Sequence, residues 1–333
     1  MTERMLEIKG LKIHFDTEAG VLQAVDGVDM GIDAGETLGV VGESGCGKSV
    51  TALTVMRLLP MPPGRIAGGE ILWRGRDLVA ADEETVRSLR AREIAMIFQE
   101  PMTSLNPVYT VGEQIAEVVR LHGTPNRKAA RARAVEMLQL VRIPNPEQRV
   151  DDYPHQFSGG MRQRVMIAMA LSCNPSLLIA DEPTTALDTT VQAQVMALLK
   201  KAQRDTGTAV VLITHNLAVA ADAAEDVAVM YAGRIVESGP VRQVFRTPMH
   251  PYTRGLLAAI PTGEETGEGG EIPRLVEIPG TVPRPGSLGA GCAFAPRCPR
   301  RQARCTEERP ELESHGEPGR AAACFYPYAG TLQ

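Results

Sequence analysis

A glycine-rich stretch at 42–49, GESGCGKS, carries the residue types that bind nucleotide phosphates. Two glycines bracket four residues, and lysine and serine follow them directly. The glycines can adopt backbone angles that other residues resist, so successive N–H groups can point inward at an anion. We expect Lys48 to reach the β- and γ-phosphates and the Ser49 hydroxyl to bind Mg²⁺. The alternative is an ordinary glycine-rich turn between a strand and a helix.

Polar side chains also follow three apolar runs that are typical of buried strands. The run at 177–181 ends in Asp181 and is followed by Glu182, the run at 94–98 leads to Gln99, and the run at 210–215 ends in His215. Open α/β sheets bind ligands at the carboxyl ends of their strands. We therefore expect Asp181 to hold Mg²⁺ through water and Glu182 to polarise the attacking water. Gln99 can ligate Mg²⁺ and touch that water, and His215 can contact the γ-phosphate. A solvated turn and a structural histidine are the alternatives.

A serine and two glycines, Ser158, Gly159 and Gly160, open an apolar helical pattern that runs to Ser172. The N-terminus of a helix offers free N–H groups and a partial positive charge, so it is a second anion-binding end. Within one copy of the chain it has no obvious phosphate to bind. A second chain could supply one.

The elements that must position these residues alternate between strand and helix patterns. An apolar strand at 37–41 precedes the phosphate loop, and a helix at 48–59 follows it until Pro60. A strand–helix–strand order in the second half of the chain predicts a parallel α/β sheet. Further expected elements are two antiparallel strands within 5–33, a β-pattern at 68–78 with its turn at Gly68-Gly69, helices at 82–93, 111–122, 127–141, 158–172 and 190–204, and a hairpin around Ala232-Gly233.

The composition of the 333-residue chain is that of an ordinary globular protein, with 44% hydrophobic and 23% charged residues. A net charge of −5 argues against a basic nucleic-acid surface, so no nucleic-acid partner is expected. No apolar run approaches the ~20 residues that cross a bilayer, and the N-terminus lacks the apolar core of a signal peptide. We expect a cytoplasmic protein that serves membranes only by docking on another chain. The acidic, Gly-rich segment at 263–271 predicts a mobile linker or loop.

The order and spacing of these motifs over 1–245 resemble the ATP-binding cassette of ABC transporters. The resemblance implies an α/β fold with a RecA-like, mainly parallel sheet, an antiparallel β subdomain and a helical subdomain at about 100–174. It also implies that residues 246–333 form a small Cys-rich C-terminal extension. Two cassettes of this kind form a head-to-tail dimer with two ATP molecules between them. Each ATP lies between the phosphate loop of one subunit and the Ser158-type signature of its mate.

The resemblance assigns roles residue by residue. Phe15, or alternatively His14, stacks on adenine, Glu182 is the general base, His215 holds the γ-phosphate, and Lys48 and Gln99 complete the catalytic set. The resemblance implies that Ser49, Gln99 and Asp181 bind Mg²⁺. The ATP-binding set is Phe15, Gly42, Glu43, Ser44, Gly45, Cys46, Gly47, Lys48, Ser49, Val50, Gln99 and Asp181, and Ser158, Gly159, Gly160 and Asp188 belong to the dimer seam. Phe157 and Met161 depart from the family's usual LSGGQ signature, but the serine and both glycines are intact.

A finer resemblance is to the ATPase subunits of oligopeptide and dipeptide importers, a group that includes nickel-chelate importers. The segments EPMTSLNPVYTVGEQI (100–115) and HPYTRGLLAAIP (250–261) carry it. It implies a peripheral subunit on the cytoplasmic face of the membrane, with a related second ATPase chain, two permease subunits and an extracytoplasmic substrate-binding protein as partners. Di- and oligopeptides are the expected cargo, with nickel chelates, glutathione or oligosaccharides left open. A non-transport ABC ATPase is disfavoured because the chain has no heptad run.

Four of the six cysteines, Cys292, Cys298, Cys305 and Cys324, gather near the C-terminus. Their spacings do not match the CxxC pairs of most structural zinc sites. Four thiolates can hold a [4Fe–4S] cluster, and reduced free thiols are the alternative. The importer resemblance favours the cluster. The nearby arginines Arg297, Arg300, Arg301 and Arg304 could offset its negative charge or could form a solvated basic loop.

Overall fold

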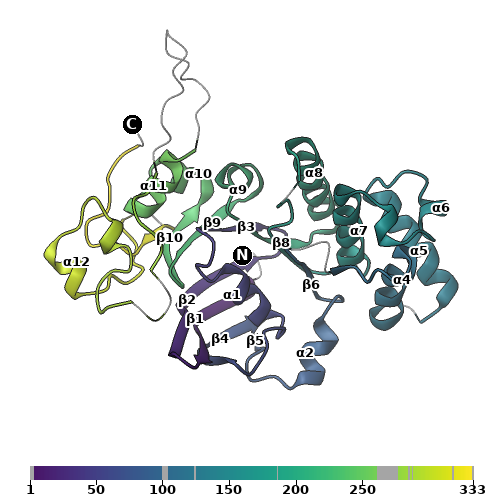
Figure 1. Cartoon of the computed structure of the whole chain (residues 1–333), viewed down its shortest axis with the longest axis horizontal. Coiled ribbons are helices and arrows are strands. Elements are labelled where there is room, and N and C mark those ends of the chain that lie inside the picture. Colours follow the sequence, from purple (N-terminus) through teal and green to yellow (C-terminus); the bar gives the residue numbers. More distant parts are fainter. Residues whose placement is uncertain are drawn as a thin grey trace, which may run out of the picture.

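Two β-sheets organise the molecule in the computed structural model (Figure 1). The structure describes residues 4–99, 104–123, 125–185, 187–260, 277–283, 286, 288–316 and 319–331. The segment expected to be a linker or loop at 263–271 and residues 100–103 lie outside this description. Strand order is β2-β1-β4-β5 in the four-stranded sheet and β11-β10-β9-β3-β8-β7-β6 in the seven-stranded sheet.

The seven-stranded sheet places the ends of the predicted strands side by side. Its parallel strands are β3 (Thr37–Val41), β6 (Ile94–Ile97), β7 (Leu177–Asp181), β8 (Ala209–Thr214) and β9 (Asp226–Tyr231). At the edge, β10 (Arg234–Pro240) pairs antiparallel with β9, and β11 (Ala321–Ala322) pairs antiparallel with β10. Every residue of β3, β6, β7 and β8 is buried. Burial on both faces explains why these strands are continuous apolar runs. The parallel register brings their carboxyl ends to one edge.

The four-stranded sheet is antiparallel and packs one face on the core. Its strands are β1 (Arg4–Thr17), β2 (Gly20–Asp33), β4 (Gly64–Trp73) and β5 (Arg76–Asp77). The predicted turn at Gly68-Gly69 is wrong, because β4 continues through both glycines. Gly69 has φ +89°, and the register of β1 against β4 shifts there. These glycines form a bulge, and the turn falls at Arg74 and Gly75 instead.

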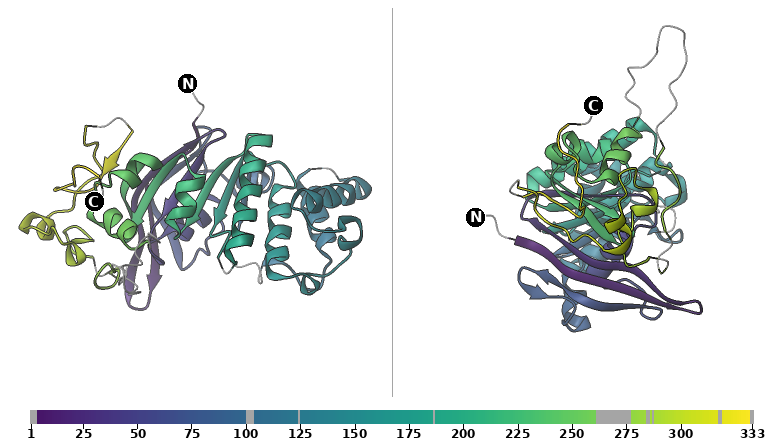
Figure 2. Two further views of the ribbon diagram at one scale, coloured as in Figure 1. Left: turned by 90° about the horizontal axis from the view of Figure 1, so that it is seen from above. Right: turned by 90° about the vertical axis from the view of Figure 1, so that its left-hand side faces the viewer.

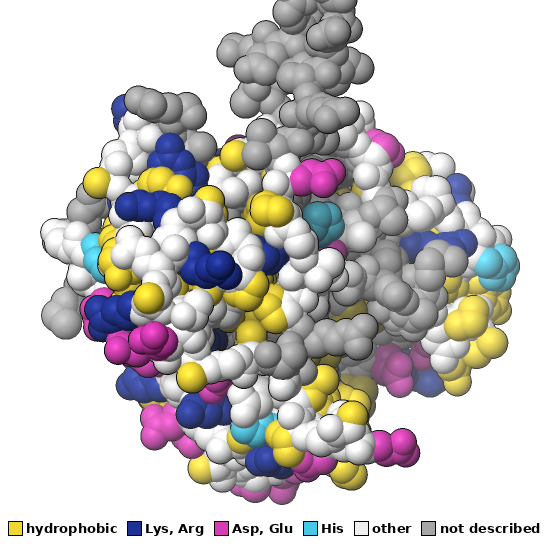
Figure 3. All heavy atoms as spheres, turned by 60° about the vertical axis from the view of Figure 1, so that its left-hand side comes forward, with side chains coloured by type: hydrophobic (Ala, Val, Ile, Leu, Met, Phe, Trp, Pro, Cys, Tyr) yellow, Lys and Arg dark blue, Asp and Glu magenta, His cyan; other side chains and the backbone are white. Residues whose placement is uncertain are grey.

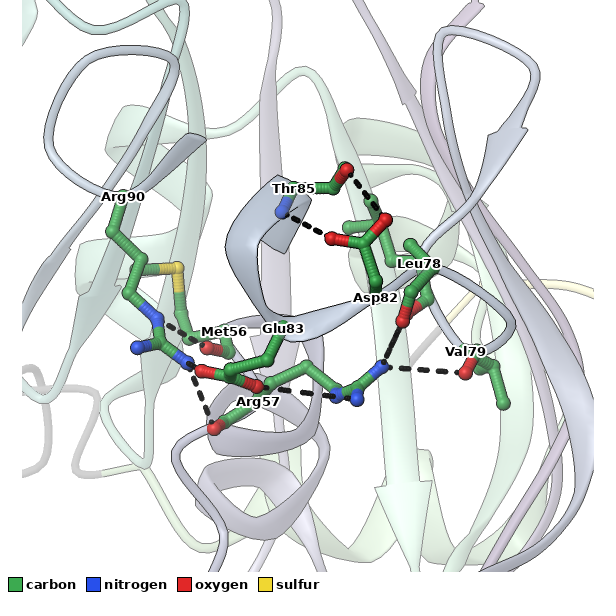
Figure 4. Close-up of polar contacts among 9 residues, drawn as sticks. Met56, Arg57, Leu78, Val79, Asp82, Glu83, Thr85 and Arg90 are labelled. Atoms are coloured by element: carbon green, nitrogen blue, oxygen red, sulfur yellow. Dashed lines mark hydrogen bonds and ion pairs between the residues drawn. The ribbon is translucent and has the colours of Figure 1, made fainter. Parts of the chain in front are cut away.

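The helix after the phosphate loop, α1 (Lys48–Val55), is one turn shorter than predicted. Its end is fixed by Arg57, which has φ +51°. The Arg57 guanidinium donates to the carbonyl oxygens of Leu78 at 2.9 Å and Val79 at 3.3 Å (Figure 4). Arg90 donates to the carbonyl oxygens of Met56 and Arg57, both at 3.1 Å. These two side chains tie the end of α1 to α2 (Glu83–Leu89) and the segment before it.

The helical subdomain lies at one end of the molecule, on the right of Figure 1. It comprises α4 (Val111–His122), α5 (Arg127–Leu140), α6 (Pro146–Arg149), the 3₁₀ helix η1 (Pro154–Gln156) and α7 (Gly159–Leu171), with α8 (Thr189–Thr206) beside it. Buried apolar residues of α4, α5, α7 and α8 form one continuous core with β6 and β7. Because this core reaches the sheet, the helices and the strand ends are packed as one unit.

The C-terminal region lies at the opposite end and packs against the sheet (Figure 2). Its elements are α10 (Val241–Arg246), α11 (Pro251–Ala258), η2 (Ala295–Arg297) and α12 (Ala303–Glu307), whereas α9 (Leu217–Ala223) packs on β3 and β8. Tyr231 of β9, Tyr252 of α11 and Phe294 share a buried aromatic cluster with ring centroids 4.6–5.4 Å apart. The expected extension after residue 245 therefore shares a core with the sheet. No described helix is long and apolar enough to span a bilayer.

Candidate nucleotide site

The predicted phosphate loop connects β3 to α1 and needs its glycines. Gly42 has φ +155° and Gly47 has φ +108°. A Cβ atom at Gly42 would lie 2.1 Å from the Met230 carbonyl oxygen, and one at Gly47 would lie 2.8 Å from the Ala24 carbonyl oxygen. Lys48 is 5% exposed, and its ammonium donates to the carbonyl oxygens of Gly42 at 2.8 Å and Glu43 at 3.0 Å. The loop is thus a closed turn folded around the lysine head.

Three predicted residues meet at one carboxylate. Glu182 Oε2 lies 3.2 Å from Gln99 Nε2 and 3.2 Å from His215 Nδ1. The Thr185 hydroxyl, which sequence reasoning missed, donates to the same oxygen at 2.8 Å. Burial acts to raise the pKa of Glu182, but the hydrogen bonds from Thr185 and His215 outweigh it, so the pKa lies below its usual value. The carboxylate therefore stays ionised in mildly acidic solution.

Asp181 lies beside this carboxylate at the end of β7 and suits a bound cation. It is 3% exposed, and burial raises its pKa, while a hydrogen bond with the Ser49 hydroxyl opposes the rise. Its Oδ1 atom is buried and has no hydrogen-bond partner among the described residues. A buried orphan carboxylate oxygen beside a hydroxyl is the oxygen donor set that Mg²⁺ prefers. The predicted pair of Ser49 and Asp181 therefore fits Mg²⁺.

The phosphate loop and the strand ends line a cleft that is open to solvent and has a volume of about 410 Å³. It is lined by Gly42, Glu43, Ser44, Gln99, Glu182, His215, Leu217 and Leu256. Six of these residues were predicted from the sequence. Leu217 of α9 and Leu256 of α11 were not, because an apolar wall residue carries no chemical signature. Cys46 is fully buried behind the loop, and Val50 packs into the core below it.

The serine–diglycine tip lies elsewhere on the molecule. Ser158 caps α7, and its hydroxyl accepts the Met161 amide at 3.4 Å. Ser158 and Gly159 are exposed, and neither residue nor Gly160 lines the cleft. Phe157 is 3% exposed and fills the helical core, which explains how phenylalanine is accommodated before the serine.

Asp188 caps α8 through the Val191 amide at 2.9 Å. Phe15 packs against the core on β1 and does not line the cleft, so its stacking on adenine stays a prediction, as does the alternative at His14.

Comparison with known proteins places these features in one family. The family described as ABC transporter matches residues 25–185, and the family described as oligopeptide/dipeptide transporter, C-terminal region, matches residues 236–305. Relatives include the oligopeptide transport ATP-binding protein OppD of Bacillus subtilis (strain 168), 55% identical over 88% of this chain and 81% of that protein. The dipeptide transport ATP-binding protein DppD of Escherichia coli (strain K12) is 47% identical over 97% of each chain. This chain belongs to the ABC transporters, as an ATP-binding subunit of the oligopeptide/dipeptide type.

Solved structures agree with this assignment. The dimeric structure of MJ0796, a bacterial ABC transporter cassette, matches with a TM-score of 0.64 at 28% identity, covering 72% of this chain and 99% of that one. A dimeric post-hydrolysis state of the same cassette, bound to ADP and Pi, matches equally well. The predicted ABC cassette fold with its two kinds of sheet is confirmed. This ABC subunit therefore belongs to a family of ATP-hydrolysing transporter subunits.

The C-terminal region of this ABC subunit gathers its four cysteines around one small, mostly apolar cavity. Cys292, Cys298, Cys305 and Cys324 all line it, and all are free thiols. Burial raises the pKa of Cys324 to about 11. The cavity holds only about 20 Å³, roughly one water molecule. Among the described residues, no group of three or more His, Cys, Asp or Glu side chains is arranged to hold a metal ion.

The arginines near these cysteines do not all face the cavity. Arg297 pairs with Glu43 of the phosphate loop at 3.0 Å, and Arg304 pairs with Glu308 at 2.8 Å. On the face that carries the C-terminal region, Lys and Arg side chains are interspersed with Asp and Glu (Figure 3). The side chain of Arg297 is 6% exposed, so it does not belong to a solvated basic loop, and compensation of a cluster charge by these arginines stays a prediction.

Proposed function

We propose that this ABC subunit powers the import of di- and oligopeptides by closing and reopening a head-to-tail pair of cassettes. One observation carries the proposal: the residues of the cleft and the exposed tip at Ser158 and Gly159 lie on separate parts of one chain. The tip has free N–H donors at the start of α7 and no phosphate of its own. A mate facing the opposite way brings its tip over this cleft. The dimeric form of the related MJ0796 cassette supports this arrangement.

The roles of Glu182, His215 and Gln99 in this proposal rest on the geometry of the cleft, and the other roles rest on the family resemblance. Glu182 accepts the proton of the attacking water, and His215 and Gln99 hold its carboxylate in place. Ser49 and Asp181 would hold Mg²⁺, which would supply positive charge to the β- and γ-phosphates. Lys48 binds the same phosphates. Asp188 lies at the seam, and Phe15 stacks on adenine.

An apolar groove beside α7 supports docking on permease subunits. It measures about 470 Å³ and is lined by Leu58, Phe98, Val118, Met166 and Met169 among others. Leu58 and Phe98 are exposed large hydrophobic residues, which mark interaction sites when they gather. The groove adjoins Gln99, so a permease element seated there would sense the nucleotide. We place the subunit on the cytoplasmic face of the membrane, with two permeases, a related second ATPase chain and an extracytoplasmic binding protein.

The peptide cargo rests on the relatives, whose printed names are those of oligopeptide and dipeptide transport proteins. Its test is uptake of a labelled dipeptide and a labelled tetrapeptide by membrane vesicles that contain the assembled importer. Uptake that requires ATP and is abolished by Lys48→Ala supports peptide import. Vesicles that hydrolyse ATP but accumulate neither peptide would contradict it.

The variant Glu182→Gln tests the catalytic role. It keeps the shape of the side chain but removes the base, so we expect ATP binding close to wild type and hydrolysis slower by about 10²–10⁴-fold. The measurements are equilibrium ATP binding and phosphate release by the assembled importer. Glu147→Gln on the exposed surface is the matched control and should retain both. Normal turnover in Glu182→Gln would remove the assigned base.

We also propose that the four cysteines ligate a [4Fe–4S] cluster. The donor set supports this, because four thiols surround one cavity. The cavity holds only about 20 Å³, so a cluster would have to displace side chains that now fill the space around the thiols. Protein purified without oxygen should be brown with broad visible absorbance, and iron analysis should find about four irons per chain. A colourless, iron-free preparation would contradict the cluster and indicate that the four cysteines are free thiols.

A further inference from the structure

The C-terminal region reaches into the nucleotide site at Glu43, the second residue of the phosphate loop. The Glu43 amide donates to the Tyr252 phenol oxygen at 2.9 Å. Its carbonyl oxygen accepts from Lys48 at 3.0 Å. Both of its carboxylate oxygens accept from Arg297 Nη1, at 3.0 and 3.1 Å. Two of these three contacts come from residues that lie more than 200 positions later in the chain.

The Arg297 side chain is buried and is held in place by several hydrogen bonds. It is 6% exposed. Its Nε donates to the Pro279 carbonyl oxygen at 3.0 Å, and its Nη2 donates to the Ile278 carbonyl oxygen at 3.3 Å. Its Nη1 also lies 3.4 Å from the Tyr231 hydroxyl. A buried guanidinium that loses its carboxylate is strongly destabilised, so this geometry holds Arg297 and Glu43 together.

The same short turn carries Arg297 and two of the gathered thiols. The cysteine segment, residues 292–298, contains η2 and folds back on itself. The Ala295 amide donates to the Cys292 carbonyl oxygen at 3.0 Å, and the Cys298 amide donates to the Ala295 carbonyl oxygen at 3.3 Å. Because these bonds make one rigid turn, Cys292 and Cys298 cannot shift far without moving the Arg297 backbone.

We propose that Arg297 is a positioning residue of the nucleotide site, which couples the cysteine segment to the phosphate loop through Glu43. Holding the Glu43 carboxylate fixes the second residue of the loop and therefore the directions of the N–H groups that follow it. Coupling between two sites is reciprocal, so nucleotide binding also orders the cysteine segment. The proposal rests on ATP binding by this chain. It requires neither peptide transport nor an iron–sulfur cluster.

The first test measures MgATP affinity of the full purified chain by calorimetry, for wild type, Arg297→Gln, Glu43→Gln and the double variant. We expect Arg297→Gln to weaken binding about tenfold. The double variant should bind no more weakly than Arg297→Gln alone, since the two changes remove the same contact. The double variant removes both charges of the pair and leaves no buried charge unpaired. It should therefore fold, and its affinity can be measured, even if Arg297→Gln does not fold.

The matched control is Arg304→Gln, which lies in the same region but pairs with Glu308 at the surface. It should bind MgATP as wild type does. Affinity in Arg297→Gln equal to wild type, or losses that simply add in the double variant, would overturn the proposal. Since affinity is measured on the isolated chain, a failure of peptide import leaves this result unaffected.

A second readout separates positioning from mere stabilisation. Hydrogen exchange of the amides at 292–298 should slow when MgATP binds to wild type and to Arg304→Gln. In Arg297→Gln, saturating MgATP should leave that exchange unchanged. A purely structural role would raise exchange in the variant with and without nucleotide but retain the ATP-dependent slowing. If MgATP left the hydrogen exchange of the cysteine segment unchanged in the wild type, the proposed coupling would also be overturned.

Discussion

At the scale of single residues, the site depends on how many donors converge on Glu182. Gln99, Thr185 and His215 all approach one carboxylate oxygen within 2.8–3.2 Å. Three donors favour the ionised form of a carboxylate, and here they outweigh its burial. The general base proposed for this ABC subunit is thus ready to accept a proton without a titration step near neutral pH.

This environment predicts a change in pH dependence for Thr185→Val. The variant loses one hydrogen bond to the ionised carboxylate, so the pKa of Glu182 should rise towards its ordinary value. The base must be ionised to act, and the acid limb of the pH profile of kcat should therefore move to higher pH. The measurement is phosphate release by the assembled importer across pH 5–9. An unchanged acid limb would show that another group controls it.

Most residues of the cleft could be predicted from sequence because each follows a local pattern. Gly42, Glu43 and Ser44 belong to a continuous motif, and Gln99, Glu182 and His215 each follow a strand. Thr185, Tyr252 and Arg297 were missed for the opposite reason. Thr185 looks like an ordinary turn residue, and Tyr252 and Arg297 reach Glu43 across 209 and 254 positions. Contacts at that separation depend on tertiary packing, which no local spacing encodes.

At the scale of elements, strands and helices were predicted well where burial alone sets the pattern. β7 occupies 177–181 as expected, because burial on both faces leaves a continuous apolar run. The errors arose where backbone conformation or a contact with a distant residue determines where an element ends or turns. The bulge at Gly69 looks like a turn in sequence, and α1 stops early because Arg57 turns the chain and bonds to carbonyl oxygens beyond β5.

The bulge predicts unequal effects of two neighbouring substitutions in β4. A Cβ atom at Gly69 would lie 2.5 Å from the Gly10 carbonyl oxygen at a positive φ, whereas one at Gly68 meets only Lys12 at 3.9 Å. We expect Gly69→Ala to lower the free energy of unfolding by about 1–3 kcal/mol. Gly68→Ala should change it by less than about 1 kcal/mol. Urea unfolding of the full chain measures both, and equal losses would argue against the bulge.

At the scale of the whole molecule, the exposed tip predicts a variant that folds but cannot work in a pair. A Cβ atom at Gly159 meets nothing within 4 Å, so Gly159→Asp should leave melting temperature and ATP affinity unchanged. In a head-to-tail dimer its carboxylate would face the triphosphate held by the mate, and like charges repel. We expect ATPase activity of the assembled importer to fall by at least about 10²-fold.

The matched control for this variant is Gly289→Asp, another exposed glycine with open space around it. It lies in the C-terminal region and should keep full activity in the assembled importer. Full activity in Gly159→Asp as well would mean that the tip does not meet a nucleotide.

The two-residue strand β11 has a consequence for anyone who shortens this protein. Ala321 and Ala322 pair with Ser238 and Glu237 along the outer side of β10, and Arg320 places its guanidinium 3.4 Å from the fully buried Glu237 carboxylate. Truncating the chain before Arg320 would expose the backbone hydrogen-bonding groups on the outer edge of β10. An exposed strand edge can pair with other chains and promote aggregation. The truncation would also remove the Arg320 cation from beside Glu237, whose buried carboxylate would keep the backbone amides of Met249 and His250 as donors. Insolubility of a tail-less form would therefore say nothing about thiols, and only point substitutions can reveal what the cysteines do.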